Sequence, residues 1–594
     1  MSPGLRRGLL LALLLGLPPL LAQRALPAPR LDADSAEYFA LLRSLYCDQD
    51  VDLANEYERF GLLQRYDKIR PTVTGHRRTI FSVGPALLWM PFYGVGDALA
   101  RAAGSADEGY SAWHVRAVAL GSLAYVVLGL LLLDAPLRSL VPARLATASL
   151  LLLLYATFLW WYVVYEPVMS HAGSFALSAL ALRLLWDQRA GLGRRRALAL
   201  GLVLGLAATV RWQNGLLLLL PGLALLGQLL PALRRRSWGA AVAVVATGLL
   251  TLVAFGLGAL PQMLAWKAIF GSYLLADPPH GADFLRLGHP YLLQTFFSSR
   301  HGLLYWTPVL WGAALGLRSF VRRERWQAGL LLVPAALMSY VNACSGDWWA
   351  GGSFSNRRFD SVLPLVAPAL ALGLAALASA VRRRPALALG AAGTLLTLFN
   401  LLFMQQYRRN LVPRDDSLAF ADVAANNAAL LQSAVGTPLA WPANWLFAAE
   451  HGLPVRQFDR TVGLYLFYRQ NNLGGVIDLG DERVDRGLLD EGWSRPWPCG
   501  PGLVCRSPGA GARLFVPLDV PETLDVTLRL RGRGDLALLL GGRPLAQLPL
   551  EAELRDVTVR APAGLWRREL NELRFVPSPG GEVQVERLIF ARVR

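Results

Sequence analysis

Charge of either sign is scarce in this chain. Only 17% of its 594 residues are charged, 54% are hydrophobic, and the mean hydropathy is +0.36. Lysine and arginine together outnumber the acids by 59 to 42, and nearly all of these bases are arginine. So little charge in so long a chain excludes an ordinary soluble enzyme and places the sequence in the class of multi-pass membrane proteins.

Other features are missing altogether. The arginines form no continuous basic stripe but fall in short clusters between apolar runs, so we expect no nucleic-acid partner and take the lipid bilayer as the chain's surroundings. No ligand spacing of the zinc type is present. There is also no glycine-rich nucleotide fingerprint and no convincing internal repeat.

Cysteine is rare, with four residues. Cys499 and Cys505 enclose a tight loop, CGPGLVC, and we expect them to form a disulfide. A second disulfide, between Cys47 and Cys344 in two other loops, is an alternative that the sequence leaves open. The topology inferred below places all four outside the cytoplasm, where disulfides persist.

Apolar runs divide residues 1–405 into about eleven predicted transmembrane helices. The first, at about 8–22, follows two arginines and is interpreted as an uncleaved helix with its N-terminus inside, rather than as a cleaved signal peptide. The other predicted spans cover about residues 112–133, 145–165, 170–187, 197–211, 213–230, 238–262, 303–318, 326–344, 360–381 and 385–405.

In this arrangement the arginine clusters share one side, which the positive-inside rule makes cytoplasmic. These clusters comprise Arg138, Arg144, Arg189, Arg194, Arg195, Arg196, Arg234, Arg235, Arg236, Arg318, Arg322, Arg323, Arg325, Arg382, Arg383 and Arg384. All seven histidines fall on the opposite side. We therefore expect a multi-pass protein of the plasma or inner membrane, with a cytoplasmic N-terminus and an extracytoplasmic C-terminal region.

The apolar stretch at about 80–103 is the exception to this count. It is interrupted by prolines and by Gly94 and Gly96, and counting it as a span would invert every later loop. We interpret it as juxtamembrane helices within a first extracytoplasmic loop, 25–111. Trp89, Phe92 and Tyr93 would then lie at headgroup level.

Hydropathy falls after residue 405. Residues 406–497 mix helix-like and strand-like segments, whereas residues 498–594 alternate apolar and polar positions between glycine and proline turns, as in LDVTLRLRG. The pattern predicts an extracytoplasmic α+β region that ends in a β-sandwich of the jelly-roll type.

Polar residues outside the arginine clusters gather in the predicted outward loops. A carboxylate there can take a proton from an acceptor hydroxyl or amine. Arginines can hold a phosphate bidentately, and tryptophan suits a sugar face or the membrane interface. The loops therefore indicate group transfer from a lipid phosphate at the membrane surface. The candidates in these loops are Asp34, Glu166, His171, Arg211, Arg300, His301, Trp348, Arg357 and Arg358.

The order of these features resembles the GT-C membrane glycosyltransferases, close to glycosyltransferase family 39. That superfamily includes protein O-mannosyltransferases and bacterial lipid A aminoarabinose transferases. The resemblance covers about residues 1–405 and rests on four features: an acid near the start of the first outward loop, the segment FSVGPALLWMPF, an acid in the second outward turn, and the late loop WWAGGSF…RRF. It implies the GT-C fold and a polyprenyl-phosphate-linked sugar donor.

The resemblance also assigns roles. Asp34, four residues before Tyr38, takes the position of the family's base, but Asp34 is followed by serine where the family often has glutamate. This departure leaves Asp32 and Glu37 as rivals. Glu166 matches the family's second acid, and a divalent metal between Asp34 and Glu166 is an open alternative. The phosphate-binding arginine is Arg357 or Arg358, which the sequence does not separate.

The expected function is transfer of a hexose or pentose from polyprenyl phosphate to a lipid, glycan or protein acceptor on the extracytoplasmic side. The absent nucleotide fingerprint fits a lipid-linked donor. The alternative is a lipid-phosphate transporter or flippase whose charged loops gate a path. Transporters usually place charged residues within their spans and repeat their halves. Here the spans are nearly free of charge and no repeat is visible.

Overall fold

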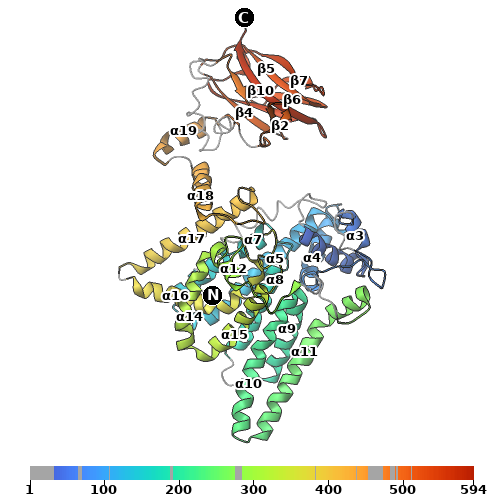
Figure 1. The fold of residues 1–594 in the computed structure, drawn as a ribbon, viewed down its shortest axis with the longest axis vertical. Helices are drawn as coiled ribbons and strands as arrows, with labels where there is room; N and C mark the ends of the chain where they lie inside the picture. Colours follow the sequence, from blue (N-terminus) through green and yellow to red (C-terminus); the bar gives the residue numbers. More distant parts are fainter. Residues whose placement is uncertain are drawn as a thin grey trace. The chain divides into compact units, whose positions relative to one another are not determined.

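The computed structural model describes residues 33–63, 70–105, 107–187, 191–274, 284–381, 383–435, 438–451, 473–481, 488–489, 492–509, 511–518 and 520–593. The chain divides into a helical unit, Met1–Asn427, and a second unit, Ala428–Arg594. Figure 1 shows the helices of the first unit and the strands of the second. The predicted first helix at 8–22 and the rival acid Asp32 lie outside the described residues.

The described part of the helical unit begins at residue 33 with segments that precede α5 (Ala112–Arg138). They are α2 (Ala33–Arg43), the π-helical turn η1 (Ser44–Asp48), α3 (Ala54–Arg59) and α4 (Gly84–Ala102). The helices that follow are α5 (Ala112–Arg138), α6 (Ala143–Tyr155), α7 (Leu159–Val164), α8 (His171–Trp186), α9 (Arg194–Val210), η3 (Trp212–Leu218), α10 (Leu219–Arg234), α11 (Trp238–Phe270), α12 (Leu292–Phe297), α13 (Leu303–Trp306), η5 (Pro308–Leu310), α14 (Trp311–Arg323), α15 (Arg325–Ala343), η6 (Arg357–Phe359), α16 (Leu363–Ala380) and α17 (Pro385–Arg408).

Within the described part of the chain, five helical segments are long and apolar enough to cross a membrane. They are Ala112–Arg138, Trp212–Arg234, Trp238–Phe270, Leu363–Ala380 and Pro385–Arg408. Long apolar helices satisfy their own backbone hydrogen bonds, which is what the hydrocarbon core of a bilayer requires. The chain is therefore a multi-pass membrane protein, and the predicted count of eleven spans stays a prediction.

The predicted span at 145–165 is wrong as a single helix. It is divided into α6 and α7, because residues 156–158 leave the helix. The side-chain amide of Asn400, on α17, donates hydrogen bonds of 3.0 Å to the carbonyl oxygens of Tyr155 and Thr157. A residue distant in sequence thus satisfies the carbonyl groups that the break exposes.

The predicted span at 303–318 is also broken, at Thr307. This residue has φ −134° and ψ 65° and separates α13 from η5 and α14. The cause is local, since Pro308 lacks an N–H group and restricts the residue before it to non-helical conformations.

Most of the stretch at 80–103 forms one continuous helix, α4 (Gly84–Ala102), instead of several short ones. Its glycines admit neighbours: a Cβ atom on Gly96 would lie 2.9 Å from the Cβ of Ala117, and one on Gly94 would lie 3.2 Å from the Tyr46 hydroxyl. Trp89 and Tyr93 are buried in the core of the helical unit, and their predicted position at headgroup level, like that of Phe92, stays a prediction. The glycines therefore serve close packing against α5 and η1.

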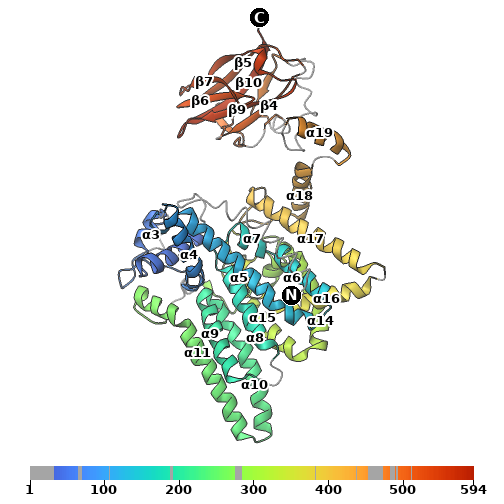
Figure 2. The same ribbon diagram turned by 180° about the vertical axis from the view of Figure 1, so that it is seen from behind.

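Glycine also brings other helices together. A Cβ on Gly201 or Gly205 of α9 would lie within 2.4 Å of backbone oxygens of α11. Gly316 of α14 and Gly373 of α16 meet each other's helices in the same way. Such small-residue contacts let membrane helices approach closely. Figures 1 and 2 show α11 beside both α9 and α10, and Gly201 and Gly205 permit the close approach of α9 to α11.

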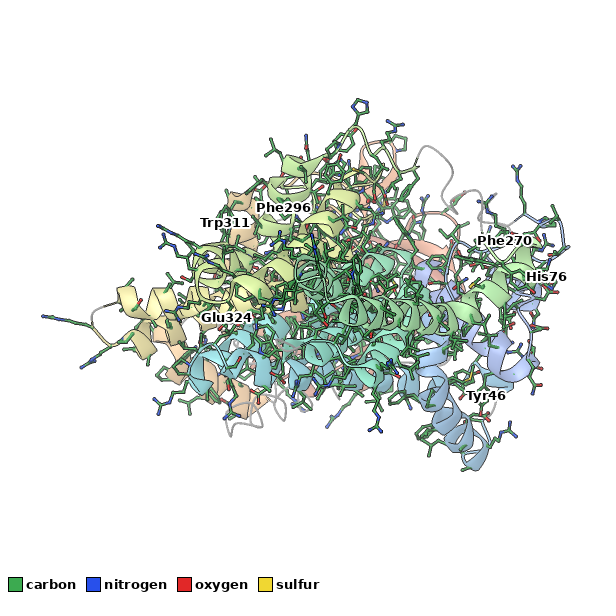
Figure 3. All side chains as sticks on the ribbon, turned by 90° about the horizontal axis from the view of Figure 1, so that it is seen from below. Tyr46, His76, Phe270, Phe296, Trp311 and Glu324 are labelled. Carbon is green, nitrogen blue, oxygen red and sulfur yellow. A yellow bond between two sulfur atoms is a disulfide. The ribbon has the colours of Figure 1, made fainter. Side chains whose placement is uncertain are left out.

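The C-terminal end of α11 contacts the polar hairpin that precedes α4. The Thr74 hydroxyl donates a 2.6 Å hydrogen bond to the Ile269 carbonyl, and the Thr72 hydroxyl donates to the same oxygen. Figure 3 shows His76, from this hairpin, near Phe270. The hairpin therefore supplies partners for a helix end that would otherwise be unsatisfied.

The second unit contains a two-sheet β-rich domain. One sheet has the order β1-β10-β5-β8 and the other β4-β9-β6-β7, with all neighbours antiparallel, and β2 pairs with β3 separately. The strands are β1 (Val476–Asp478), β2 (Trp497–Gly500), β3 (Leu503–Cys505), β4 (Ala512–Leu518), β5 (Leu524–Arg533), β6 (Asp535–Leu540), β7 (Arg543–Pro549), β8 (Arg555–Ala561), β9 (Glu569–Pro577) and β10 (Glu582–Arg592).

Alternation produces this domain's core. In β5 the buried residues Leu524, Val526, Leu528 and Leu530 alternate with outward polar ones, as a half-buried strand requires. Because β1 pairs with β10, this β-rich domain begins before the predicted boundary at residue 498. The jelly-roll connectivity stays a prediction.

Two helices precede these strands. The structure also shows which cysteines are paired. The helices are α18 (Phe420–Val435) and α19 (Trp441–His451), and Phe447 of α19 packs with Phe515 and Leu570 of the strands. Cys499 and Cys505 form a disulfide. Cys47 and Cys344 are free, so the alternative disulfide between them is absent.

Candidate active site

Asp34 and Arg357 meet although they come from opposite ends of the helical unit's sequence. Asp34 lies in the first turn of α2, and its Oδ2 is 2.8 Å from Nη1 of Arg357 in η6. Their side chains are 33% and 20% exposed, so a ligand can reach both. A negative charge in a first helical turn is also favoured by the helix dipole.

Arg357 is held by more than this pair. Its Nε donates a 3.1 Å hydrogen bond to the carbonyl of Ala350, in the glycine-rich loop. Burial lowers the pKa of Arg357, but Asp34 foremost, and Tyr162 and Glu166 after it, raise the pKa above its ordinary value. Gly351 has φ +77°, a left-handed conformation that favours glycine, and a Cβ atom there would be in ordinary contact, at 3.6 Å, with Arg357 Nη2.

Arg358, the next residue, is engaged elsewhere. Its Nη1 donates to the Asp347 carbonyl at 2.8 Å and its Nη2 to Asp347 Oδ1 at 2.5 Å. The Arg358 carbonyl accepts hydrogen bonds from the side chains of Gln213 and Asn342, each at 3.1 Å. Burial lowers the pKa of Arg358 in spite of Asp347. Both terminal nitrogens of Arg358 are therefore already used within its own loop.

Beneath this pair lies a buried network centred on Asp360. Asp360 and His171 are fully buried, and His171 Nδ1 lies 2.7 Å from Asp360 Oδ2. Asp360 Oδ1 accepts from the Ser174 hydroxyl at 3.1 Å and from the Ser361 amide at 2.6 Å. Arg211 Nε lies 3.5 Å from Asp360 Oδ2. The negative charge of Asp360 offsets the cost of burying the Arg211 guanidinium, whose side chain is only 14% exposed.

Ser170 joins this network to the helix that carries Asp34. Arg211 Nη1 donates to the Ser170 hydroxyl at 3.1 Å, and the Tyr38 hydroxyl donates to the same oxygen at 3.1 Å. Asp34 and Tyr38 are four residues apart on α2, so they share one helix face. The spacing that the sequence singled out thus aligns Asp34 with Arg211 and Arg357.

Glu166 follows α7 and is half-buried. Its charge contributes to the raised pKa of Arg357, which places it near the Asp34–Arg357 pair. No group of three or more His, Cys, Asp or Glu side chains in the described part of the chain is arranged to hold a metal ion. If a divalent ion binds between Asp34 and Glu166, its remaining ligands come from other atoms.

The remaining predicted residues lie on the same loop or beside it. The guanidinium of Arg300 stacks on Trp349 at 3.9 Å, a cation–π contact. His301 is buried against Trp306, and burial lowers its pKa to about 4, so it is neutral. Trp348 contacts Trp349 and Tyr291, and its carbonyl accepts a hydrogen bond from Asn356. Arg300 therefore contacts the same loop that carries Trp348 and Ala350, and the Ala350 carbonyl accepts a hydrogen bond from Arg357.

Two further acids near the site are Asp360, which was not among the predicted site residues, and Glu37, which was a rival for the base. Asp360 was not selected, although an acid directly before the apolar run of α16 is a recognisable signal. Glu37, a rival base, is buried and accepts hydrogen bonds from Tyr57 at 3.0 Å and Thr79 at 3.2 Å. Burial raises the pKa of Glu37 to about 7 against the effect of these bonds. Glu37 is thus less accessible than Asp34.

Comparisons with known proteins give structural neighbours alone. No family model and no curated protein matches the chain. A crystal structure of ArnT from Cupriavidus metallidurans bound to undecaprenyl phosphate is 15% identical, covering 74% of this chain and 79% of that one, with a TM-score of 0.38. The apo state of the same protein is 13% identical, covering 71% and 76%, with a TM-score of 0.36.

The arabinosyltransferase EmbB from Mycobacterium smegmatis is a further neighbour. It is 11% identical, and the likeness covers 100% of this chain but 64% of EmbB, with a TM-score of 0.37. An arabinosyltransferase is a glycosyltransferase, the class that the sequence resembles. At these TM-scores the likeness is coarse, and the function of the chain has to be inferred from its own residues.

Proposed function

We propose that the chain is an integral membrane glycosyltransferase that moves a sugar from a polyprenyl-phosphate donor to an acceptor hydroxyl or amine. The observation that carries this proposal is the Asp34–Arg357 pair, 2.8 Å apart and open to a ligand on both partners. An accessible carboxylate beside an accessible guanidinium supplies a base and a phosphate ligand at one point. The arabinosyl and undecaprenyl-phosphate neighbours agree with it.

In the proposed reaction Asp34 accepts the proton of the acceptor group. The acceptor's electron pair forms a bond to the anomeric carbon of the sugar, while the bond from that carbon to the phosphate oxygen breaks. The departing polyprenyl phosphate carries the electron pair away as negative charge. Arg357 and Arg211 stabilise this charge, since both present guanidinium groups beside Asp34 and its helix. Inversion at the anomeric carbon follows from attack opposite the leaving group.

The two arginines of the late loop receive different roles. Arg357 is the phosphate ligand, because it faces the accessible Asp34. Arg358 fixes the loop, because Asp347 engages both of its terminal nitrogens. Phosphate binding to Arg357 competes with its ion pair to Asp34, which frees the carboxylate when the donor is in place.

The proposed orientation follows the positive-inside rule. The arginine-rich turns lie in the cytoplasm, and Asp34, Arg357 and the second unit lie outside. Assays have to identify the sugar and the acceptor, and they have to test whether transfer requires a divalent ion. A chelator that stops transfer, with recovery on adding Mg²⁺ or Mn²⁺, would establish the ion.

The test is transfer from a panel of tritium-labelled polyprenyl-phosphate hexoses and pentoses by the full chain in proteoliposomes. Asp34→Asn removes the base, and we expect transfer to fall by about 10²- to 10⁴-fold. Glu58→Gln, an exposed acid in the same segment, serves as the matched control and keeps its activity. Undiminished transfer by Asp34→Asn removes the assigned base, and lipid flipping without transfer favours the transporter alternative.

A further inference from the structure

A cavity of about 540 Å³ lies at the far end of α15 from the candidate active site. Gly227 and Gln228 of α10 form one wall, and Arg322 and Arg323 at the end of α14 form another. The rest of the lining comes from the start of α15 and the residue before it, namely Glu324, Arg325, Trp326 and Gln327. The other end of α15 reaches Asn342, which holds the Arg358 carbonyl. The 19 residues of α15 separate the two places by about 28 Å.

The arginines on the lining of this cavity outnumber its acids. Arg322, Arg323 and Arg325 are exposed, and no acid of the described residues pairs with them. Glu324, the one acid on the lining, makes a contact of its own and offsets at most one of the three charges. The cavity therefore keeps an excess of positive charge.

The start of α15 adds to this field. No side chain caps the N-terminus of α15, and the helix dipole favours an anion at this end. Arg325 stands in the first turn, where a positive charge is opposed by the helix dipole. An anion bound among these arginines relieves that opposition.

The rim of the cavity is apolar. The Trp326 ring lies against α10, where a Cβ atom on Gly227 would be 2.0 Å from its Cη2. Val333 and Leu337 follow Trp326 at helical spacing and are 49% and 38% exposed, and Leu226 of α10 is 46% exposed. A tryptophan between a charged cavity and an exposed apolar stripe is the arrangement found at the headgroup level of a membrane.

We propose that this cavity binds the phosphate headgroup of an anionic membrane lipid, with the acyl chains along the stripe of Val333 and Leu337. The guanidinium groups bind the phosphate oxygens bidentately. Basic pockets between membrane helices on the cytoplasmic side recognise lipid headgroups by this chemistry. Inorganic phosphate shares the anionic group but gains nothing from the apolar stripe, so the lipid is the occupant. The site is independent of the sugar-transfer chemistry.

Native mass spectrometry of the full chain tests the proposal with dioleoylphosphatidylglycerol, dioleoylphosphatidylcholine and inorganic phosphate. We expect a retained adduct with phosphatidylglycerol, at least tenfold weaker binding of phosphatidylcholine, and no competition by millimolar phosphate. Replacing Arg322, Arg323 and Arg325 together by alanine should weaken the phosphatidylglycerol adduct by roughly a hundredfold, since each arginine near an anionic surface contributes about 1 kcal/mol.

Two further variants separate the cavity from general surface charge. Replacing Arg234, Arg235 and Arg236 by alanine removes the same charge outside the cavity lining, and the adduct should persist. Gly227→Leu displaces Trp326 without changing charge and should weaken the adduct. Equal loss in both triple variants, or equal binding of phosphatidylcholine, or displacement of the lipid by inorganic phosphate, overturns the proposal.

Discussion

The arginines near the two ends of α15 differ in whether acidic side chains pair with them. At the candidate active site Arg211, Arg357 and Arg358 are each matched by an acid, namely Asp360, Asp34 and Asp347. At the other end three exposed arginines stand without acid partners among the described residues. Burying a guanidinium costs hydration free energy that a carboxylate has to offset, whereas an exposed one keeps its water. Arginines paired with acids are therefore fixed in position by those ion pairs. Exposed arginines without acid partners can bind an anion from outside the protein.

The largest effect on stability should come from Asp360→Asn. The amide keeps some hydrogen bonds but cannot neutralise Arg211, and a buried charge pair broken on one side costs about 3–5 kcal/mol. Unfolding of the full chain in detergent micelles measures the change. Ser174→Ala, which removes one bond to Asp360 and one from Asn214, is the control and should cost about 1–2 kcal/mol. Equal losses in both variants would show that the charge of Asp360 has no special weight.

Glu37 should make stability depend on pH. Because its pKa is raised from 4.5 to about 7, the folded chain keeps a proton that the unfolded chain releases between these values. Stability therefore falls as the pH rises through this window, by up to about 3 kcal/mol for this group. Glu56, whose pKa burial also raises to about 7, acts with the same sign. Thermal unfolding of Glu37→Gln from pH 4.5 to 8 should show a flatter profile, and an unchanged slope contradicts the assignment.

Replacing Arg357 and replacing Arg358 should have different effects on the affinity for undecaprenyl phosphate. Arg357→Ala removes a charged hydrogen-bonding partner of the phosphate, so the affinity for undecaprenyl phosphate should fall about 10- to 100-fold. Arg358→Ala frees Asp347 and loosens the loop, and the affinity should change by less than about threefold. Equilibrium binding of labelled undecaprenyl phosphate measures both. The reverse order would move the phosphate site to Arg358.

The smallest effect is expected for an exposed pair. Arg592 in β10 lies 3.2 Å from Glu522, and its side chain is 62% exposed. Screening by water leaves such a pair with less than about 0.5 kcal/mol. Arg592→Ala should leave the unfolding midpoint of the second unit unchanged within error. A loss comparable to that of Asp360→Asn would remove the distinction between buried and exposed arginines.

Much of the architecture could be read from local patterns. The alternation in β5 predicted a buried face. The family resemblance singled out the spacing of Asp34 and Tyr38, and the structure places both on α2. The breaks beside Thr157 and Thr307 differ in kind. Pro308 is visible in the sequence, but Asn400, which satisfies the exposed carbonyl groups near Thr157, comes from a helix far along the chain.

The site was predictable in its residue types but not in its pairing. Arg357 and Arg358 are adjacent, and their directions depend on the backbone before them, where Ser355 has φ +61°. Trp89, Tyr93 and Asp360 are buried because distant segments of the chain pack around them. Such packing cannot be predicted from composition. The sequence therefore indicated which side chains gather at this end of the helices, and the fold decided which of them meet.

The most direct test of the central claim is a double-mutant cycle on Asp34 and Arg357 in the labelled transfer assay. If the two act as one unit, Asp34→Asn and Arg357→Ala each slow transfer, and the double variant is little slower than Asp34→Asn alone, because the effects of residues that work together do not multiply. Losses that multiply, or transfer by Asp34→Asn at the unmodified rate, would contradict a reaction centred on this pair.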